Sequence, residues 1–310
     1  MDAESFAYGA FLLGFALVGL ATACYVALPL WPRAVYRPAV ATEAGEAGPT
    51  MAVAAEGQAP GWLGPMATTG TWLAVVVLTA SLVARWVAAG RPPYSNMWEF
   101  TVAFGWGIVL FYALFEWRLR ARPDGPQYGR TVGAFVLPVA LAMFAISLAF
   151  FPSEVRPLLP ALQSSRILGA HVATMILAYA VLAVSFGAGV LYLVQGSGGQ
   201  RRFARLPSAD ALEEIAHRSV LVGFPLLTLG LVLGAYWAYS AWGRYWGWDP
   251  KETSALVIWL IYSGYLHARN LRGWRGRRSA WLLVAGFGAL LFSYFAVNLW
   301  VGGLHSYAGV

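Results

Sequence analysis

Long apolar runs, separated by short polar and charged segments, make up most of this chain. A run of about 20 apolar residues is long enough to cross the hydrocarbon core of a bilayer as a helix. The pattern predicts an all-α integral membrane protein with about eight transmembrane helices, organised as a single polytopic domain over residues 1–310. The predicted spans are 6–30, 70–89, 97–115, 131–151, 167–194, 219–239, 250–268 and 279–301.

The segments between the spans carry their own signals. Residues 38–66 are rich in Ala, Gly, Pro and Glu with little apolar periodicity, which predicts a flexible loop. Residues 208–218 have the pattern of a short surface helix that precedes the sixth span. Ser95-Asn96, followed by Glu99, predicts an N-terminal cap for the third span.

Composition agrees with a membrane protein. Hydrophobic residues make up 59% of the chain and charged residues 11%, with a mean hydropathy of +0.60, whereas soluble domains carry roughly a quarter charged residues. The net charge of +7 is spread over several loops, so it does not indicate a nucleic-acid surface. No basic region precedes residues 6–30, so we expect a first span there and not a cleaved signal peptide.

The single cysteine limits the chemistry of the chain. Cys24 has no second cysteine to pair with, and no Cys-x-x-Cys-His motif is present, so haem is not attached covalently to this chain in the c-type manner. Cys24 lies among apolar residues and is expected to be a small core residue. Arg85, near the end of the second span, is expected to extend its charged head to the membrane surface.

Loop charge predicts the orientation. Most of the 21 Lys and Arg residues lie on the first, third, fifth and seventh connections, and cytoplasmic loops are the ones enriched in these residues. We therefore expect a multi-pass protein of the cell (inner or plasma) membrane, with both termini and the sixth connection outside the cytoplasm. The basic residues on the opposite side are Arg85, Arg91, Arg156, Arg166, Arg244 and Lys251.

An aromatic segment at residues 237–253 stands between the sixth and seventh spans. Aromatic belts occur at every bilayer interface, which explains one or two tryptophans but not a cluster interrupted by Gly243 and Gly247 and ended by Asp-Pro-Lys-Glu. The glycines let the backbone approach whatever the rings face. The aromatic residues of this segment are Trp237, Tyr239, Trp242, Tyr245, Trp246 and Trp248.

This aromatic segment resembles the tryptophan-rich WWD signature of haem-handling membrane proteins. The wider match runs from Trp237 to Tyr265-Leu266-His267 and resembles the CcsA family of cytochrome c biogenesis proteins, of the CcsBA/ResC type. The resemblance implies non-covalent haem b, a CcsB/ResB-type membrane partner and an apocytochrome c substrate with a Cys-x-x-Cys-His motif. The signature positions are Trp242, Gly243, Trp246, Trp248, Asp249 and Glu252.

Asp249 also has a simple structural interpretation. It can be the N-cap of the seventh span, with Pro250 at the first helical position and Glu252 completing a capping box. We therefore expect a capping role for both carboxylates and no catalytic one. Arg244 and Lys251 are the nearest cations for haem propionates, although ordinary loop charges explain them equally well.

Two histidines are predicted to approach the aromatic segment on the outer side. His171 lies about one turn inside the fifth span, and His305 follows the eighth span. Imidazole ligates haem iron, and polar residues within spans usually mark function. Either residue alone could instead be an interfacial histidine bonded to a backbone carbonyl. The resemblance matches both to the external haem-ligating histidines of the family.

The other two histidines lie near the cytoplasmic side. His267 follows Pro250 by 17 residues, which places it roughly 25 Å along the helix, too far to share iron with the outer pair. It can be an interfacial residue beside Arg269, whereas the resemblance implies a transmembrane haem ligand whose second ligand comes from the partner subunit. His217 lies in a charged segment and is expected to be solvated.

These observations favour a protein that presents haem to apocytochrome c for thioether attachment. Whether the chain is itself an enzyme stays open, because positioning of haem and thiols can suffice. Two alternatives remain at this point. One is a haem transporter or chaperone without synthase activity, and the other is a haem-bearing respiratory electron-transfer subunit.

Overall fold

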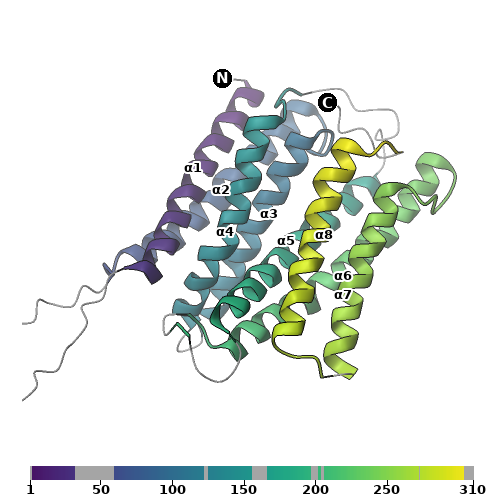
Figure 1. Ribbon diagram of the computed structural model, residues 1–310. Coiled ribbons are helices and arrows are strands. Elements are labelled where there is room, and N and C mark those ends of the chain that lie inside the picture. Colours follow the sequence, from purple (N-terminus) through teal and green to yellow (C-terminus); the bar gives the residue numbers. More distant parts are fainter. Residues whose placement is uncertain are drawn as a thin grey trace, which may run out of the picture.

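The computed structural model describes residues 2–31, 59–121, 125–155, 166–196, 202–203, 206–271 and 273–303. The elements within these residues are α-helices, which confirms the predicted all-α fold (Figure 1). Each predicted span has its helix. The helices are α1 (Ala3–Leu30), α2 (Leu63–Ala89), α3 (Met97–Leu119), α4 (Gly125–Phe150), α5 (Arg166–Gln195), α6 (Ala209–Trp242), α7 (Pro250–Leu271) and α8 (Arg277–Trp300).

Two segments differ from the sequence-based expectation. The first turn of α2 starts at Leu63, so the end of the predicted loop 38–66 is helical, while residues 38–58 lie outside the described residues. The prediction of a separate surface helix at 208–218 is wrong, because residues 209–218 form the first turns of α6. Ser208 caps that helix by accepting the Ala211 N–H at 3.3 Å, and the sequence has no Gly or Pro before residue 223 that would end it.

Seven of the helices in the described part of the chain are long and apolar enough to span a bilayer. The exception is α7, which has Lys251 and Glu252 in its first turn and Arg269 in its last turn. Its hydropathy is lower for that reason, although its 22 residues are long enough to cross.

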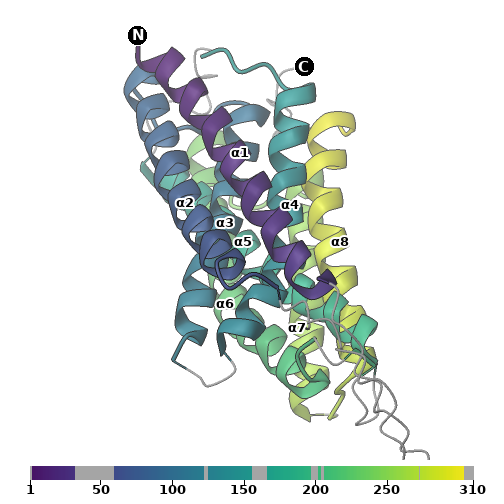
Figure 2. The same cartoon turned by 90° about the vertical axis from the view of Figure 1, so that its left-hand side faces the viewer.

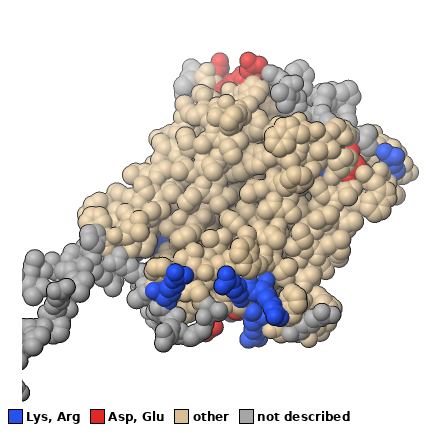
Figure 3. All heavy atoms as spheres, in the orientation of Figure 1, with Lys and Arg blue, Asp and Glu red and all other residues tan. Residues whose placement is uncertain are grey.

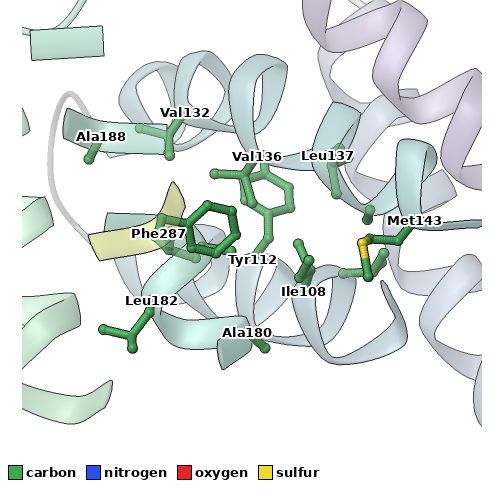
Figure 4. Close-up of a cluster of buried hydrophobic side chains, with 14 of the residues drawn as sticks. Ile108, Tyr112, Val132, Val136, Leu137, Met143, Ala180, Leu182, Ala188 and Phe287 are labelled. Carbon is green, nitrogen blue, oxygen red and sulfur yellow. The ribbon is translucent and has the colours of Figure 1, made fainter. Parts of the chain in front are cut away.

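The helices lie side by side in one bundle, and α1 begins at the same end at which α8 finishes (Figures 1 and 2). α1 packs against α2 and α4, α3 packs against α4 and α5, and α5 packs against α6 and α8. α7 packs mainly against α8 and touches α6 at few places. Side chains from α3, α4, α5 and α8 meet in the core, with Tyr112, Val136, Leu182 and Phe287 among them (Figure 4).

Arg85 is buried in a charged network and does not reach the membrane surface as expected. Only 2% of the residue is exposed, because its Nε lies 3.0 Å from Oε1 of the fully buried Glu99. Arg91 pairs with the other oxygen of Glu99, also at 3.0 Å. The predicted cap of α3 is confirmed: Asn96 accepts the Glu99 N–H, and Glu99 accepts the Ser95 N–H, each at 2.8 Å.

A second buried carboxylate ties α1 and α2 to the other end of α3. Glu116 accepts hydrogen bonds from Tyr25 Oη and Thr68 Oγ1, both at 2.6 Å. Arg130 of α4 lies 3.7 Å from the same carboxylate. Cys24, next to Tyr25, is buried in this core, as the sequence predicted. A buried acid near each end of α3 therefore holds α2, and the one at Glu116 also holds α1.

Candidate functional site

The aromatic segment is part helix and part loop. α6 continues to Trp242, so Trp237, Tyr239 and Trp242 lie on its last turns and not in the connection. Gly243 ends α6 with φ 73° and donates its N–H to Tyr239 O at 2.9 Å. Glycine adopts this left-handed conformation without the steric cost of a Cβ, which explains where the helix stops.

Both carboxylates at the start of α7 are engaged in capping, which confirms the predicted capping box. Asp249 Oδ2 accepts the Lys251 N–H at 3.1 Å. Glu252 Oε2 accepts the N–H groups of Gly247 at 2.7 Å and Asp249 at 3.2 Å. These bonds bracket Trp248, a non-glycine residue with positive φ (57°). Such a conformation costs on the order of 1–3 kcal/mol, so the cap holds Trp248 in a strained position.

His171 lies in the second turn of α5 and has a defined tautomer. Its Nδ1 is 2.7 Å from the backbone oxygen of Gly230 on α6. A carbonyl oxygen only accepts hydrogen bonds, so Nδ1 carries the proton and the acceptor lone pair is on Nε2. Metal-ligating histidines are usually oriented by this kind of bond. The hydrogen bond therefore leaves Nε2 as the ring nitrogen with a lone pair.

Close packing from α6 fixes the orientation of this ring. A Cβ at Gly234 would lie 2.6 Å from His171 Cε1, so only glycine leaves room for the imidazole. The Trp237 ring is nearly parallel to the imidazole, with an interplanar angle of 11° and centroids 6.4 Å apart. Only 2% of Trp237 is exposed. It packs beside the histidine and meets Trp242 edge-on, with centroids 4.8 Å apart.

A cavity of about 150 Å³ lies between α3, α5, α6, α7 and α8, below the aromatic segment. His171 and Trp237 line it together with Tyr245 and Trp246 from the connection. Sequence reasoning missed its inner walls, such as Met175 and Tyr294. Met175 follows His171 by four residues and so shares its helix face, which was the available signal. α8 gave none.

Other rings of the segment face outward. Tyr239 and Tyr245 stack with centroids 4.6 Å apart and an interplanar angle of 12°, and both are about half exposed. Trp248 is 69% exposed and meets Trp246 edge-on at 5.7 Å. These two ring pairs place exposed aromatic surface next to the cavity, and exposed apolar surface of this kind can mark an interaction site.

Several candidate residues are placed elsewhere. Arg244 is exposed, and its guanidinium lies against Gly247, where a Cβ would be 2.6 Å from Nε; it does not line the cavity. His305 is outside the described residues. Gly303, two residues before it, lies beside the α7 cap, where a Cβ would be 2.6 Å from Asp249 Oδ1.

The two remaining histidines occupy different surfaces. His267 is exposed on α7, whereas Tyr265 on the packed face of that helix is 1% exposed. His217, expected to be solvated, is partly exposed, with Nδ1 3.5 Å from Tyr265 Oη. Packing of α6 on α7, where Glu213 pairs with Arg269, draws it inward. Among the described residues, no three His, Cys, Asp or Glu side chains group closely enough to hold a metal ion on their own.

Comparisons with known proteins agree on one family. The family model described as cytochrome C assembly protein matches residues 94–305. The chain is 37% identical to the cytochrome c biogenesis protein CcsA of Synechococcus elongatus, over 77% of this chain and 86% of the relative. It is 34% identical to the CcsA of Microcystis aeruginosa, over 78% of this chain and 87% of the relative.

A solved structure has the same fold. The cytochrome c heme lyase CcmF superposes with a TM-score of 0.66 at 18% sequence identity, covering 95% of this chain and 47% of CcmF. The chain thus corresponds to about half of that larger protein. The family match spans more than two thirds of the sequence and includes the aromatic segment and all four histidines. The chain therefore belongs to the cytochrome c assembly protein family.

Proposed function

We propose that the cavity below the aromatic segment receives one edge of a non-covalently bound haem b, with His171 Nε2 as an iron ligand, and that the chain presents this haem to apocytochrome c. The hydrogen bond from His171 Nδ1 to Gly230 O carries the proposal, because it fixes the tautomer that iron ligation requires. The donor set fits haem: an imidazole on the wall of an otherwise mainly apolar cavity. When bound, haem supplies the vinyl groups that become thioethers.

The aromatic residues have separate roles around the proposed haem site. Trp237 supports the imidazole from the side, and Tyr245 and Trp246 cover the cavity. Trp242 packs edge-on against Trp237 and so holds it in place. The exposed Trp248 is available for contact with apocytochrome c. Membership of a cytochrome c assembly family favours delivery to apocytochrome c over a respiratory electron-transfer role.

His305 is proposed as the second iron ligand of this outer site. Its support is the position of Gly303, which lies against Asp249 at the edge of the aromatic segment. The two iron ligands would then come from α5 and from the chain that follows α8.

His267 is proposed to ligate haem at a separate inner site. Its side chain is exposed on the outer face of α7, in line with Leu260 and Leu271, which are also exposed. A histidine on an outward face can ligate only together with a residue from another chain. This favours a bis-histidine site shared with a CcsB/ResB-type membrane subunit.

The visible haem spectrum of the protein purified with its partner tests these sites. The wild-type complex should show a haem Soret band, and His267→Ala should lower its intensity because the inner site loses a ligand. His217→Ala is the matched control, since His217 is near the same end of the bundle but packs on Tyr265. Equal haem content in His267→Ala and wild type would refute the inner site, and wild-type protein without haem would refute the proposed function.

The proposed orientation places both termini and the aromatic segment outside the cytoplasm. Figure 3 shows Lys and Arg side chains gathered at the end of the bundle opposite to the start of α1. Arg269 in the last turn of α7, Arg275 in the connection and Arg278 in the first turn of α8 lie at that end. Since cytoplasmic ends are enriched in such residues, this supports an extracytoplasmic aromatic segment.

Single cysteines test the orientation, in a Cys24→Ser background that removes the one natural thiol. An impermeant thiol reagent added to intact cells should label Trp242→Cys and leave Arg275→Cys unlabelled. Both should react after the membrane is opened, which controls for accessibility. Labelling of Arg275→Cys from outside would reverse the orientation.

A further inference from the structure

A small cluster of buried apolar side chains lies at the end of the bundle that carries the aromatic segment, apart from the main core. Within the described part of the chain, its buried members are Tyr94, Leu168 and Trp237. Tyr94 belongs to the connection between α2 and α3, Leu168 to the first turn of α5, and Trp237 to the last turns of α6. The cluster therefore joins the start of α3 to both helices that surround His171.

Tyr94 packs against the first turn of α5. The residue is 8% exposed, and a Cβ at Gly169 would lie 3.8 Å from its Cε1. Leu168 precedes His171 by three residues, so the two side chains are neighbours on one helix face. Trp237 lies beside the imidazole on the α6 side. Tyr94 is thus clustered with the two residues that adjoin the imidazole, although it does not line the cavity itself.

The buried carboxylate of Glu99 holds the turn that carries Tyr94. Its Oε2 accepts the Ser95 N–H at 2.8 Å and the Ser95 hydroxyl at 3.0 Å, and it pairs with Arg91 at 3.0 Å. Arg91 Nη1 also donates to Pro92 O at 3.3 Å, and the Tyr94 N–H donates to the same oxygen at 3.0 Å. Hydrogen bonds to a charged group are stronger than neutral ones. The backbone on both sides of Tyr94 is therefore fixed relative to α3.

We propose that Tyr94 is a positioning residue for His171. Its ring fixes the first turn of α5 against Trp237, and so keeps the imidazole in place for its hydrogen bond to Gly230 O. The first N–H groups of a helix have no partner within it, so the position of the first turn depends on contacts from outside. This inference rests on the proposed function and deepens it, because Tyr94 acts through the proposed iron ligand.

Maturation of cytochrome c by Tyr94 variants tests this role, with haem staining normalised to the amount of the variant protein in the membrane. Tyr94→Ala should lower maturation by about tenfold, since residues that orient a metal ligand typically contribute about 10–100-fold. Tyr94→Phe should restore maturation, because it keeps the ring. Tyr94→Leu is measured in parallel, because it keeps apolar volume in the cluster and so preserves the fold while it removes the ring.

Free imidazole distinguishes positioning of His171 from general support of the fold. In His171→Gly, added imidazole reaches iron without being attached to α5, so its position does not depend on Tyr94. With imidazole present, the double variant His171→Gly/Tyr94→Ala should therefore mature as much cytochrome c as His171→Gly alone.

Tyr192→Ala is the matched control. Tyr192 is similarly buried, at 6% exposed, and belongs to the main core near the other end of α5. Any defect of Tyr192→Ala should be the same in the wild-type protein and in His171→Gly with imidazole, because the effects of distant substitutions usually add.

Equal losses from Tyr94→Ala in the wild type and in His171→Gly with imidazole would show that Tyr94 only supports the fold. Normal maturation in both Tyr94→Ala and Tyr94→Leu would also overturn the inference. Ligation by His171 would stand in either case, because His171→Gly and its rescue test it separately. Normal maturation in His171→Gly, or no rescue by imidazole, would instead contradict the proposed function on which the inference rests.

Discussion

Mature cytochrome c should fall by more than about tenfold in cells whose sole copy of this protein carries His171→Gly. Residues that only orient a metal ligand typically contribute about 10–100-fold to metal affinity, so loss of the ligand itself should cost more. The substitution removes the imidazole but leaves the rest of the cavity, including Trp237 and Met175, in place. Haem staining of membrane cytochromes, normalised to the amount of the variant protein, measures the loss.

Added imidazole should partly restore maturation in His171→Gly, because it can occupy the vacated position and coordinate iron. Trp246→Ala and Trp248→Ala serve as controls, since these variants lose aromatic contact area and no ligand. Their defects should not respond to imidazole. Normal maturation in His171→Gly, or equal rescue of the tryptophan variants, would contradict ligation by His171.

Gly234→Ala should weaken haem binding by about 10–100-fold without removing any ligand. The added Cβ would lie 2.6 Å from His171 Cε1 and 2.9 Å from Nδ1, so the ring must move away from Gly230 O. The position is helical, and Gly→Ala in a helix usually stabilises the protein. Haem titration together with a thermal melt separates loss of affinity from unfolding.

Gly288→Ala is the matched control for that substitution. Gly288 lies on the exposed face of α8, where a Cβ would meet nothing within 4 Å. Haem affinity should therefore stay at the wild-type value. If Gly234→Ala behaves like Gly288→Ala, the His171 ring can shift without consequence, and its bond to Gly230 has no role in binding.

The fold was largely predictable from the sequence, because each helix is a long apolar run and the caps are local signals. Asn96 with Glu99, and Asp249 with Glu252, satisfy backbone groups within a few residues of themselves. Such interactions can be inferred from spacing. The continuation of α6 through residues 209–218 was missed because a charged amphipathic stretch looks different from the apolar run that follows it.

The interior of the site was less predictable. Several of these helices are apolar on most sides, so periodicity does not reveal which face meets which neighbour. The bond from His171 to Gly230 joins residues 59 positions apart on two helices, and the approach of Tyr294 to the cavity depends on where α8 packs. Arg85 was predicted to lie at the membrane interface, because the sequence does not reveal that Glu99, 14 residues away on the next helix, is its partner.

The two buried acids of α3 bear on how the protein enters the membrane during synthesis. Glu99 and Glu116 would each be costly in lipid without partners. Their main partners precede them in the chain: Arg85 and Arg91 for Glu99, and Tyr25 and Thr68 for Glu116. Because synthesis runs from the N-terminus, α1 and α2 emerge from the ribosome first and are available to receive α3. The two helices outside the family match are thus made before α3, the first helix inside it, and they carry partners for both of its buried acids.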